Sequence, residues 1–192
     1  MKTRILSKFK EGLLLGAVIL SFTACGNDDE PKIEDSFTTE FTYTAEFSED
    51  LLATADVKAY ILSPEGTVSE ETITKAKNTW TLKGNSIPDK SGVRFDFDAK
   101  ANLPENNYAI GYKCSTTVKC LNNGEVFSYK SENSAHSYTV PSQHLASFFG
   151  TSLILAGEIS KDGEAKIIDG SDIDFGLNGT TPRPPFGSGG TE

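Results

Sequence analysis

The feature that most constrains the fold is a strict two-residue alternation of apolar and polar side chains. Across residues 37–47 the odd positions hold Phe, Tyr, Ala and one Thr, while the even positions hold only Thr and Glu. Residues 93–103 repeat the pattern, with Phe95 and Phe97 on one parity and two aspartates on the other. Side chains alternate across a β-strand but repeat every 3.6 residues in a helix. Both segments are therefore predicted strands with one buried and one solvated face.

Turn-forming residues separate these strands from others of the same kind. Asn122-Asn123-Gly124 is typical of a hairpin, because Asn and Gly tolerate the positive φ angles that such a turn needs. Pro64-Glu65-Gly66 and Lys161-Asp162-Gly163 are further turn signals. The other predicted strands span residues 53–61, 108–121, 125–130, 137–140, 153–160 and 164–169.

One short helical turn is expected near residue 145. Ser142 can cap its start, Leu145, Phe148 and Phe149 share one helical face, and Gly150 can end it. Seven to nine strands with one helical turn, and no regular alternation of strand and helix, predict an all-β antiparallel sandwich. A lipocalin-like barrel is the alternative, since long meandering strands also build such barrels.

A ten-residue segment refines the sandwich prediction. Leu103-Pro104-Glu105-Asn106-Asn107-Tyr108-Ala109-Ile110-Gly111-Tyr112 resembles the link between strands E and F of immunoglobulin-like and fibronectin type III domains. Its spacing from leucine to tyrosine is one residue shorter than the usual fibronectin pattern. The resemblance implies an immunoglobulin-like β-sandwich with Tyr108 as a candidate tyrosine corner, whose hydroxyl bonds back to the corner backbone. It implies nothing about activity.

The first thirty residues resemble the leader of a bacterial lipoprotein. A basic head precedes an apolar run of about a dozen residues, shorter than the roughly twenty needed to span a bilayer. The run ends in Phe22-Thr23-Ala24-Cys25, which resembles a lipobox. The resemblance implies cleavage before Cys25 and acylation of that residue, which gives a stable membrane anchor. An ordinary secretory signal is the alternative.

The residues after Cys25 indicate where such a protein faces. The acidic run 26–30 resembles the export tag of surface-exposed lipoproteins of Gram-negative bacteria, which implies an outer-membrane location facing the cell exterior. Periplasmic retention is the alternative. Without residues 1–24 the chain keeps 14 of its 18 basic and 26 of its 27 acidic residues, a net charge of −12. Such a surface repels nucleic acid, which is therefore excluded as a partner.

Composition divides the chain into four regions. We interpret residues 1–24 as the signal peptide, 25–36 as an acidic flexible tether and 37–175 as the sandwich domain. Residues 176–192 form a tail rich in Gly and Pro, which contains too few apolar residues to order itself.

Trp80, the only tryptophan, is the candidate ligand contact. An exposed indole can stack on a sugar ring, as in surface glycan-binding modules. Because Leu82 shares its face, Trp80 is more simply a core residue of a middle strand, and both interpretations stay open.

Two cysteines, Cys114 and Cys120, share one face of the predicted strand 108–121. Six residues of straight strand separate them by about 20 Å, whereas a disulfide needs Cα atoms about 5.5 Å apart. We therefore expect two buried free thiols. A disulfide closing a tight loop is the alternative, since the expected compartment permits it.

A carboxylate pair is the strongest enzymatic feature, and it has a simpler explanation. Asp96 and Asp98 stand about 6.6 Å apart on one strand face, a separation comparable to that of glycosidase carboxylates. Arg94 and Lys100 flank them, which favours a solvated face with balanced charge.

The remaining chemistry-bearing residues carry weaker signals. His136 in a polar loop and His144 on the helical turn lack the G-x-S-x-G and H-E-x-x-H contexts of hydrolases. Asp169-Gly170-Ser171-Asp172-Ile173-Asp174 has the alternating oxygens of a calcium loop without the EF-hand spacing, so an acidic turn is favoured over a metal site.

Taken together, these residues predict a cell-surface lipoprotein that acts as a non-catalytic binding module, with no cofactor besides the lipid on Cys25. Its partners would be the membrane and a glycan, an envelope protein or a host protein. An accessory subunit that adds β-strands at a sheet edge is the alternative. A hydrolase centred on Asp96 or Asp98 is the least favoured hypothesis.

Overall fold

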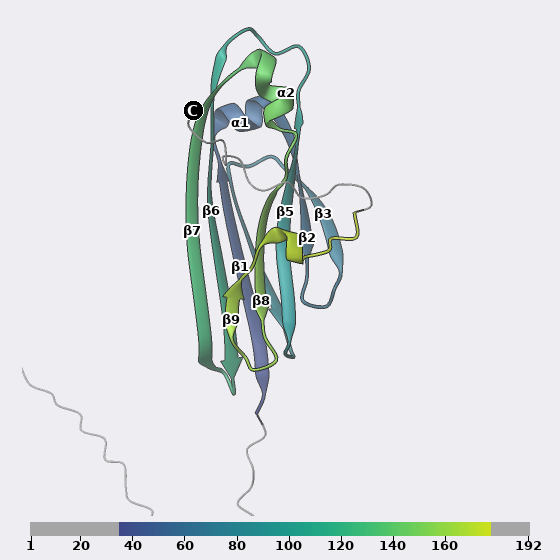
Figure 1. Ribbon diagram of the computed structural model, residues 1–192, viewed down its shortest axis with the longest axis vertical. Helices are drawn as coiled ribbons and strands as arrows, with labels where there is room; N and C mark the ends of the chain where they lie inside the picture. The colour runs from purple at the N-terminus through teal and green to yellow at the C-terminus, as the bar shows by residue number, and fades with distance from the viewer. Residues whose placement is uncertain (1–34, 178–192) are drawn as a thin grey trace, which may run out of the picture. The chain divides into compact units, whose positions relative to one another are not determined.

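The computed structural model describes residues 35–177, and this part of the chain is an antiparallel β-sandwich (Figure 1). One sheet has the order β4 (Lys77–Gly84), β1 (Phe37–Phe47), β6 (Asn107–Asn122) and β7 (Glu125–Pro141). The other has the order β3 (Val68–Ile73), β2 (Ala55–Leu62), β5 (Asp89–Ala99), β8 (Leu153–Ile159) and β9 (Ala165–Ile167). Within these residues the sheets stay separate and form no closed barrel, so the predicted sandwich is confirmed.

The regions assigned to the signal peptide, the lipobox and most of the tether lie outside the described residues, as does the tail from residue 178. Among residues 35–177, no helix is long and apolar enough to cross a membrane.

The core lies between the sheets because each strand buries the side that the alternation marks. The odd residues of β1 from Thr39 onward are buried, and so are the even residues of β6 as far as Cys120. The register places Phe41 opposite Val118. A slip of one residue would turn every buried side chain of β1 to the solvent, so burial fixes this register.

The β6–β7 hairpin joins the two longest strands, of 16 and 17 residues. Its turn has positive φ at Asn123 (52°) and Gly124 (85°), as the sequence predicts. The sequence prediction divides β7 into two short strands separated by a loop, and this is wrong. Pairing with β6 is nearly continuous along β7, and most side chains of β7 are polar, so its alternation is invisible in the sequence.

The helices differ from the prediction in two places. A helix that the sequence does not predict, α1 (Glu49–Thr54), follows β1 and is capped by Ser48, whose Oγ accepts the Leu51 N–H at 3.2 Å. The predicted helical turn is present as a 3₁₀ turn (Ser142–His144) and α2 (Leu145–Phe148). Ser142 is not its cap: Pro141 holds that position without a side-chain bond.

After β9 the chain crosses the outer face of the five-stranded sheet. A 3₁₀ turn (Gly170–Asp172) leads into Ile173 and Phe175, which form a second small core with Ala156 of β8. They lie directly over Gly92 of β5, where an added Cβ would come within 3.0 Å of Ile173 and 3.2 Å of Phe175. The outer face of this sheet is therefore partly covered by the chain's own C-terminal segment.

Candidate functional site

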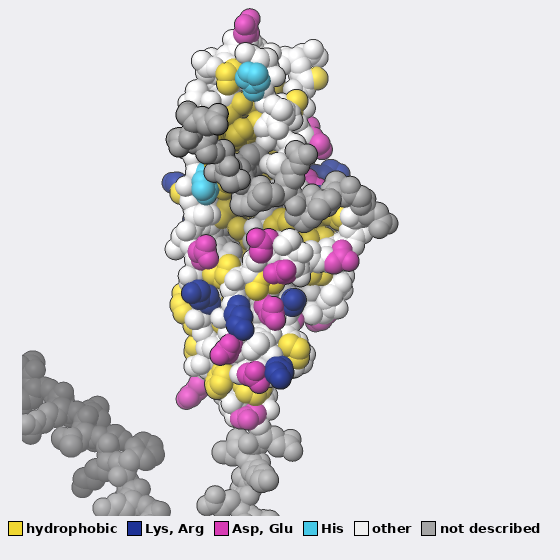
Figure 2. All heavy atoms as spheres, in the orientation of Figure 1, with side chains coloured by type: hydrophobic (Ala, Val, Ile, Leu, Met, Phe, Trp, Pro, Cys, Tyr) yellow, Lys and Arg dark blue, Asp and Glu magenta, His cyan; other side chains and the backbone are white. Residues whose placement is uncertain are grey.

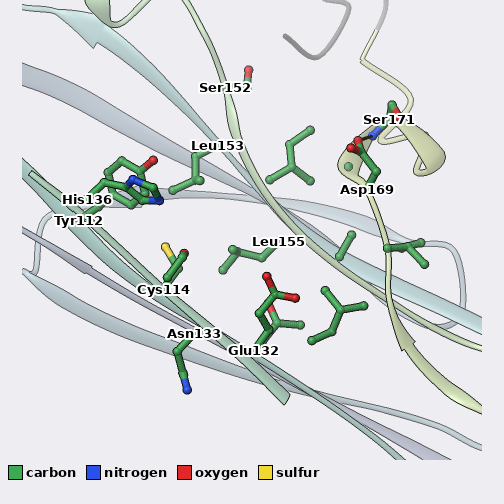
Figure 3. A pocket seen from close by; sticks show the side chains of 17 residues that line it. Tyr112, Cys114, Glu132, Asn133, His136, Ser152, Leu153, Leu155, Asp169 and Ser171 are labelled. Atoms are coloured by element: carbon green, nitrogen blue, oxygen red, sulfur yellow. Dashed lines mark hydrogen bonds between the residues drawn. The ribbon is translucent and has the colours of Figure 1, made fainter. Parts of the chain in front are cut away.

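A groove of about 650 Å³ opens between the two sheets, on the side where β7 lies across from β8 (Figure 3). Its lining comes from β6, β7, β8 and the chain around residues 167–171. The groove exists because β9 is short: it pairs only with Gly157–Ile159 of β8. The first half of β8 therefore has no strand beside it on this side among the described residues.

The lining combines an apolar floor with a polar rim. Leu153 and Leu155 of β8 lie across from Cys114 of β6 and form part of the floor. Polar side chains stand on both walls: Glu132, Ser134 and His136 from β7, and Asp169 and Ser171 from the other side. Such a combination is typical of sites that bury part of a ligand and orient it by a few polar contacts.

An aromatic cluster lies at one end of the groove. Tyr112 of β6 is opposite His136 of β7, with ring centroids 5.1 Å apart, and the His136 ring is parallel to that of Tyr138 at 6.3 Å. Burial raises the pKa of Tyr112 above its ordinary value. His136 therefore belongs to a strand and to the groove, and the predicted loop position is wrong. His144 is exposed on the 3₁₀ turn.

Trp80 lies away from this groove, on the opposite edge of the sandwich. Its strand, β4, is the edge of the four-stranded sheet, so the predicted middle-strand position is wrong. The half-buried indole packs 5.6 Å from the Phe95 ring, and Nε1 donates to Glu71 Oε2 at 3.0 Å. That bond joins the edge strands β4 and β3 of the two sheets. The role of Trp80 as a ligand contact stays a prediction.

The two aspartates of β5 have different surroundings. The Asp96 carboxylate accepts bonds from Arg94 Nε at 2.7 Å and Nη2 at 3.1 Å, and from Ser152 Oγ at 2.5 Å. Arg94 is only 3% exposed, so the predicted solvated face is wrong at this point. The reason is the returning C-terminal segment, which packs on the same face of the sheet. Asp98, by contrast, is exposed.

Both cysteines of β6 are free and buried, as the sequence predicts. Cys114 faces the groove, and burial raises the pKa of its thiol to about 12. Burial also raises the pKa of Cys120. A thiol of such high pKa is a poor nucleophile, because the thiolate is the reactive form.

The acidic segment at residues 169–174 bonds to its own backbone. Asp169 Oδ1 accepts the Ser171 N–H at 2.9 Å, which lowers the pKa of Asp169, and Asp174 Oδ1 accepts the Gly176 N–H at 2.7 Å. Across residues 35–177, no group of three or more His, Cys, Asp or Glu side chains is arranged to hold a metal ion.

Tyr108 lies at the corner that the sequence resemblance marks. Its hydroxyl donates to the Pro104 carbonyl at 3.1 Å, four residues upstream. The chain passes at this corner from β5 in one sheet to β6 in the other. The bond thus fixes a crossover between the sheets.

Comparisons with known proteins give little further information. No protein family and no curated protein matches the sequence. Among solved structures, the chain is similar to the alpha toxin from Clostridium absonum, with 16% identity over 59% of this chain and a TM-score of 0.21. The match spans 34% of the toxin's length. A similarity of this size supports no conclusion about fold or activity.

Proposed function

We propose that this protein is a non-catalytic binding module held at the cell surface by lipid on Cys25, and that it binds its partner in the groove between β7 and β8. The observation that carries the proposal is the groove itself, in which an apolar floor lies between two walls of polar side chains. The lipobox-like segment and the acidic run after it support the location, and they rest on the sequence alone.

The character of the lining points to the kind of ligand. The rim carries acidic, hydroxyl and imidazole groups, and the floor carries aliphatic side chains. On the face drawn in Figure 2, acidic and basic side chains are interspersed and neither sign forms a continuous patch. We therefore expect a ligand that is uncharged overall and has one apolar face, such as an oligosaccharide or an extended peptide.

The structural roles of the other candidates favour binding over catalysis. The Asp96 carboxylate is engaged by Arg94 and Ser152, which suits an anchor of the sheet better than a general acid. The Cys114 thiol has a pKa too high for nucleophilic work at neutral pH.

The test is a ligand screen in which the groove is filled. The full chain in detergent micelles is applied to a glycan array and to an array of ten-residue peptides. Ser134→Trp places a large side chain inside the groove from β7, and Thr72→Trp places the same side chain on the exposed outer face of β3 as a control. Binding should be lost in the first variant and kept in the second.

Two other outcomes decide between sites. Binding that survives Ser134→Trp contradicts the groove as the site. Binding that is lost in Trp80→Ala, with the thermal unfolding midpoint unchanged, places the ligand on the opposite edge and supports the indole as a sugar contact.

A further inference from the structure

The outer edge of β7 is uncovered along most of its length. β7 is an edge strand that pairs only with β6 among the described residues. Its start is held by Ser128, whose Oγ donates to the Gly163 carbonyl at 2.5 Å, and its end by Tyr138, which packs on Phe148 at 5.3 Å. Between these points lie residues 129–137, about 30 Å of strand whose alternate N–H and C=O groups face outward. Free edges of this kind can pair with another chain.

Exposed apolar side chains concentrate on the same strand. The large hydrophobic residues exposed in residues 35–177 are Val126 (60%), Phe127 (54%) and Tyr129 (57%), and all three belong to β7. Tyr129 lies in the open stretch and adds an apolar contact there. Val126 and Phe127 precede Ser128 near the hairpin turn, where Phe127 packs on Phe37 with ring centroids 5.6 Å apart.

The charges of β7 are arranged to complement a second copy of the same strand. Lys130 and Glu132 point to the inner face, since they oppose Val118 and Thr116, which are buried. Both are exposed, and neither has an ion-pair partner within the described residues. A lysine and a glutamate two residues apart on one face are self-complementary when the strand meets itself in the antiparallel direction.

We infer that β7 pairs antiparallel with β7 of a second copy of this chain, about a two-fold axis at Ser131. Around that axis, residues equally distant from Ser131 stand opposite each other, so Lys130 of each copy faces the partner's Glu132. The two nearest registers that keep the same faces aligned are centred on Lys130 or on Glu132, and they place like charges opposite each other. Charge therefore selects the register.

The pairing has two structural consequences. The four-stranded sheets of the two copies join into one continuous sheet through residues 129–133, where the open stretches of both copies overlap. Because Glu132 lines the groove, the partner's Lys130 comes to stand at the groove rim. The inference goes beyond the proposed binding activity and does not depend on which ligand the groove takes.

A cross-linking experiment on the full chain in membranes tests the register. Ser131→Cys places two thiols directly opposite each other across the axis, about 5 Å apart between Cα atoms. A short bis-maleimide should convert most of this variant to a covalent dimer. Ser137→Cys is the matched control: it is exposed and on the same face of β7, but the register puts its two copies about 40 Å apart. The chain without an introduced cysteine is a second control, which shows whether Cys114 and Cys120 react with the bis-maleimide.

Exchanging the charges in the Ser131→Cys background tests whether Lys130 and Glu132 select the register. Lys130→Glu and Glu132→Lys each place like charges opposite each other, and each should reduce the cross-linked dimer at least tenfold. The double exchange restores opposite charges and should restore the dimer. The inference is overturned if Ser131→Cys does not cross-link, if Ser137→Cys cross-links equally, or if the double exchange gives no recovery. Thermal unfolding of every variant shows that the sandwich is intact.

Discussion

Thr39 donates a hydrogen bond from Oγ1 to Oδ2 of Asp89 at 2.5 Å, across the space between the two sheets. Thr39 lies on β1 and Asp89 opens β5, and they are 1% and 7% exposed. The Lys90 N–H donates to the other carboxylate oxygen at 2.9 Å. Despite these bonds, burial raises the pKa of Asp89. The charged carboxylate loses more stabilisation by water than the two hydrogen bonds replace.

This raised pKa predicts a pH dependence of stability. An acid with a raised pKa in the folded state contributes its full stability below its unfolded pKa, about 3.9, and loses it as the pH rises through the folded value. The Asp89→Asn side chain cannot ionise. The stability of this variant should therefore decrease less as the pH rises, and its unfolding midpoint at pH 7 should be higher than that of the parent. Thermal unfolding between pH 4 and pH 8 measures the effect, with the exposed Asp162→Asn as control. A steeper decline in Asp89→Asn would contradict it.

The tyrosine corner predicts a small and specific loss of stability. Tyr108→Phe removes the hydroxyl that bonds the Pro104 carbonyl and should lower the free energy of unfolding by about 1 kcal/mol. Tyr60→Phe is the control, because the Tyr60 hydroxyl has no hydrogen-bond partner among the described residues. Urea unfolding of both variants measures the difference. Equal effects would show that the bond contributes nothing.

The second small core predicts that the chain after β9 stabilises the sandwich. Phe175→Ala removes the ring that packs over Gly92 and beside Ile173, and leaves a cavity there. The free energy of unfolding should therefore fall by about 3 kcal/mol. Asp172→Ala, at an exposed position of the same segment, should stay within about 0.5 kcal/mol of the parent. Denaturant unfolding gives both values. An unaffected Phe175→Ala would mean that the segment packs without stabilising.

The buried thiols predict a contrast between folded and unfolded protein. At pH 8 a thiol of pKa about 12 is roughly one part in ten thousand thiolate, so Cys114 should react with a disulfide reagent only slowly while folded. In denaturant without reductant, Cys114 and Cys120 should both react at once. Replacing either cysteine with alanine should lower the amount of thiol that reacts by one equivalent per chain. No reaction in denaturant would instead reveal a disulfide.

The lipobox-like segment predicts that lipid on Cys25 holds the protein at a membrane. Cys25→Ser should abolish incorporation of labelled palmitate and move the protein from the membrane fraction to the soluble fraction. Cys114→Ser should change neither, since that thiol is buried in the sandwich. Lipid label retained in Cys25→Ser would exclude the lipobox interpretation.

The buried faces of β1, β2, β5 and β6 were predictable because each strand has one buried and one solvent-exposed face. That difference appears in the sequence as alternation of apolar and polar residues. β7 was not, since its inner positions carry Lys130 and Glu132 where the pattern expects apolar residues. The six residues of α1 were missed because Leu51 and Thr54 are its only buried positions, too few to show a helical period.

The groove could not be predicted from the sequence because it depends on which strands become edges. Nothing near residue 167 shows that β9 will stop after three residues and leave half of β8 open. The burial of Arg94 has the same origin, since the segment that covers its face lies some eighty residues later in the chain.

The position of β1 has a mechanical consequence. The chain enters the sandwich through this strand, which is clamped between β4 over Thr39–Glu46 and β6 over Phe37–Phe47. Tension applied at Phe37 acts along the strand and across its inter-strand hydrogen bonds, which must then shear together instead of opening one after another. A domain tethered through an edge strand would peel under such a load. In the lipid-anchored protein that we propose, a pull on the anchor would therefore load β1 in shear.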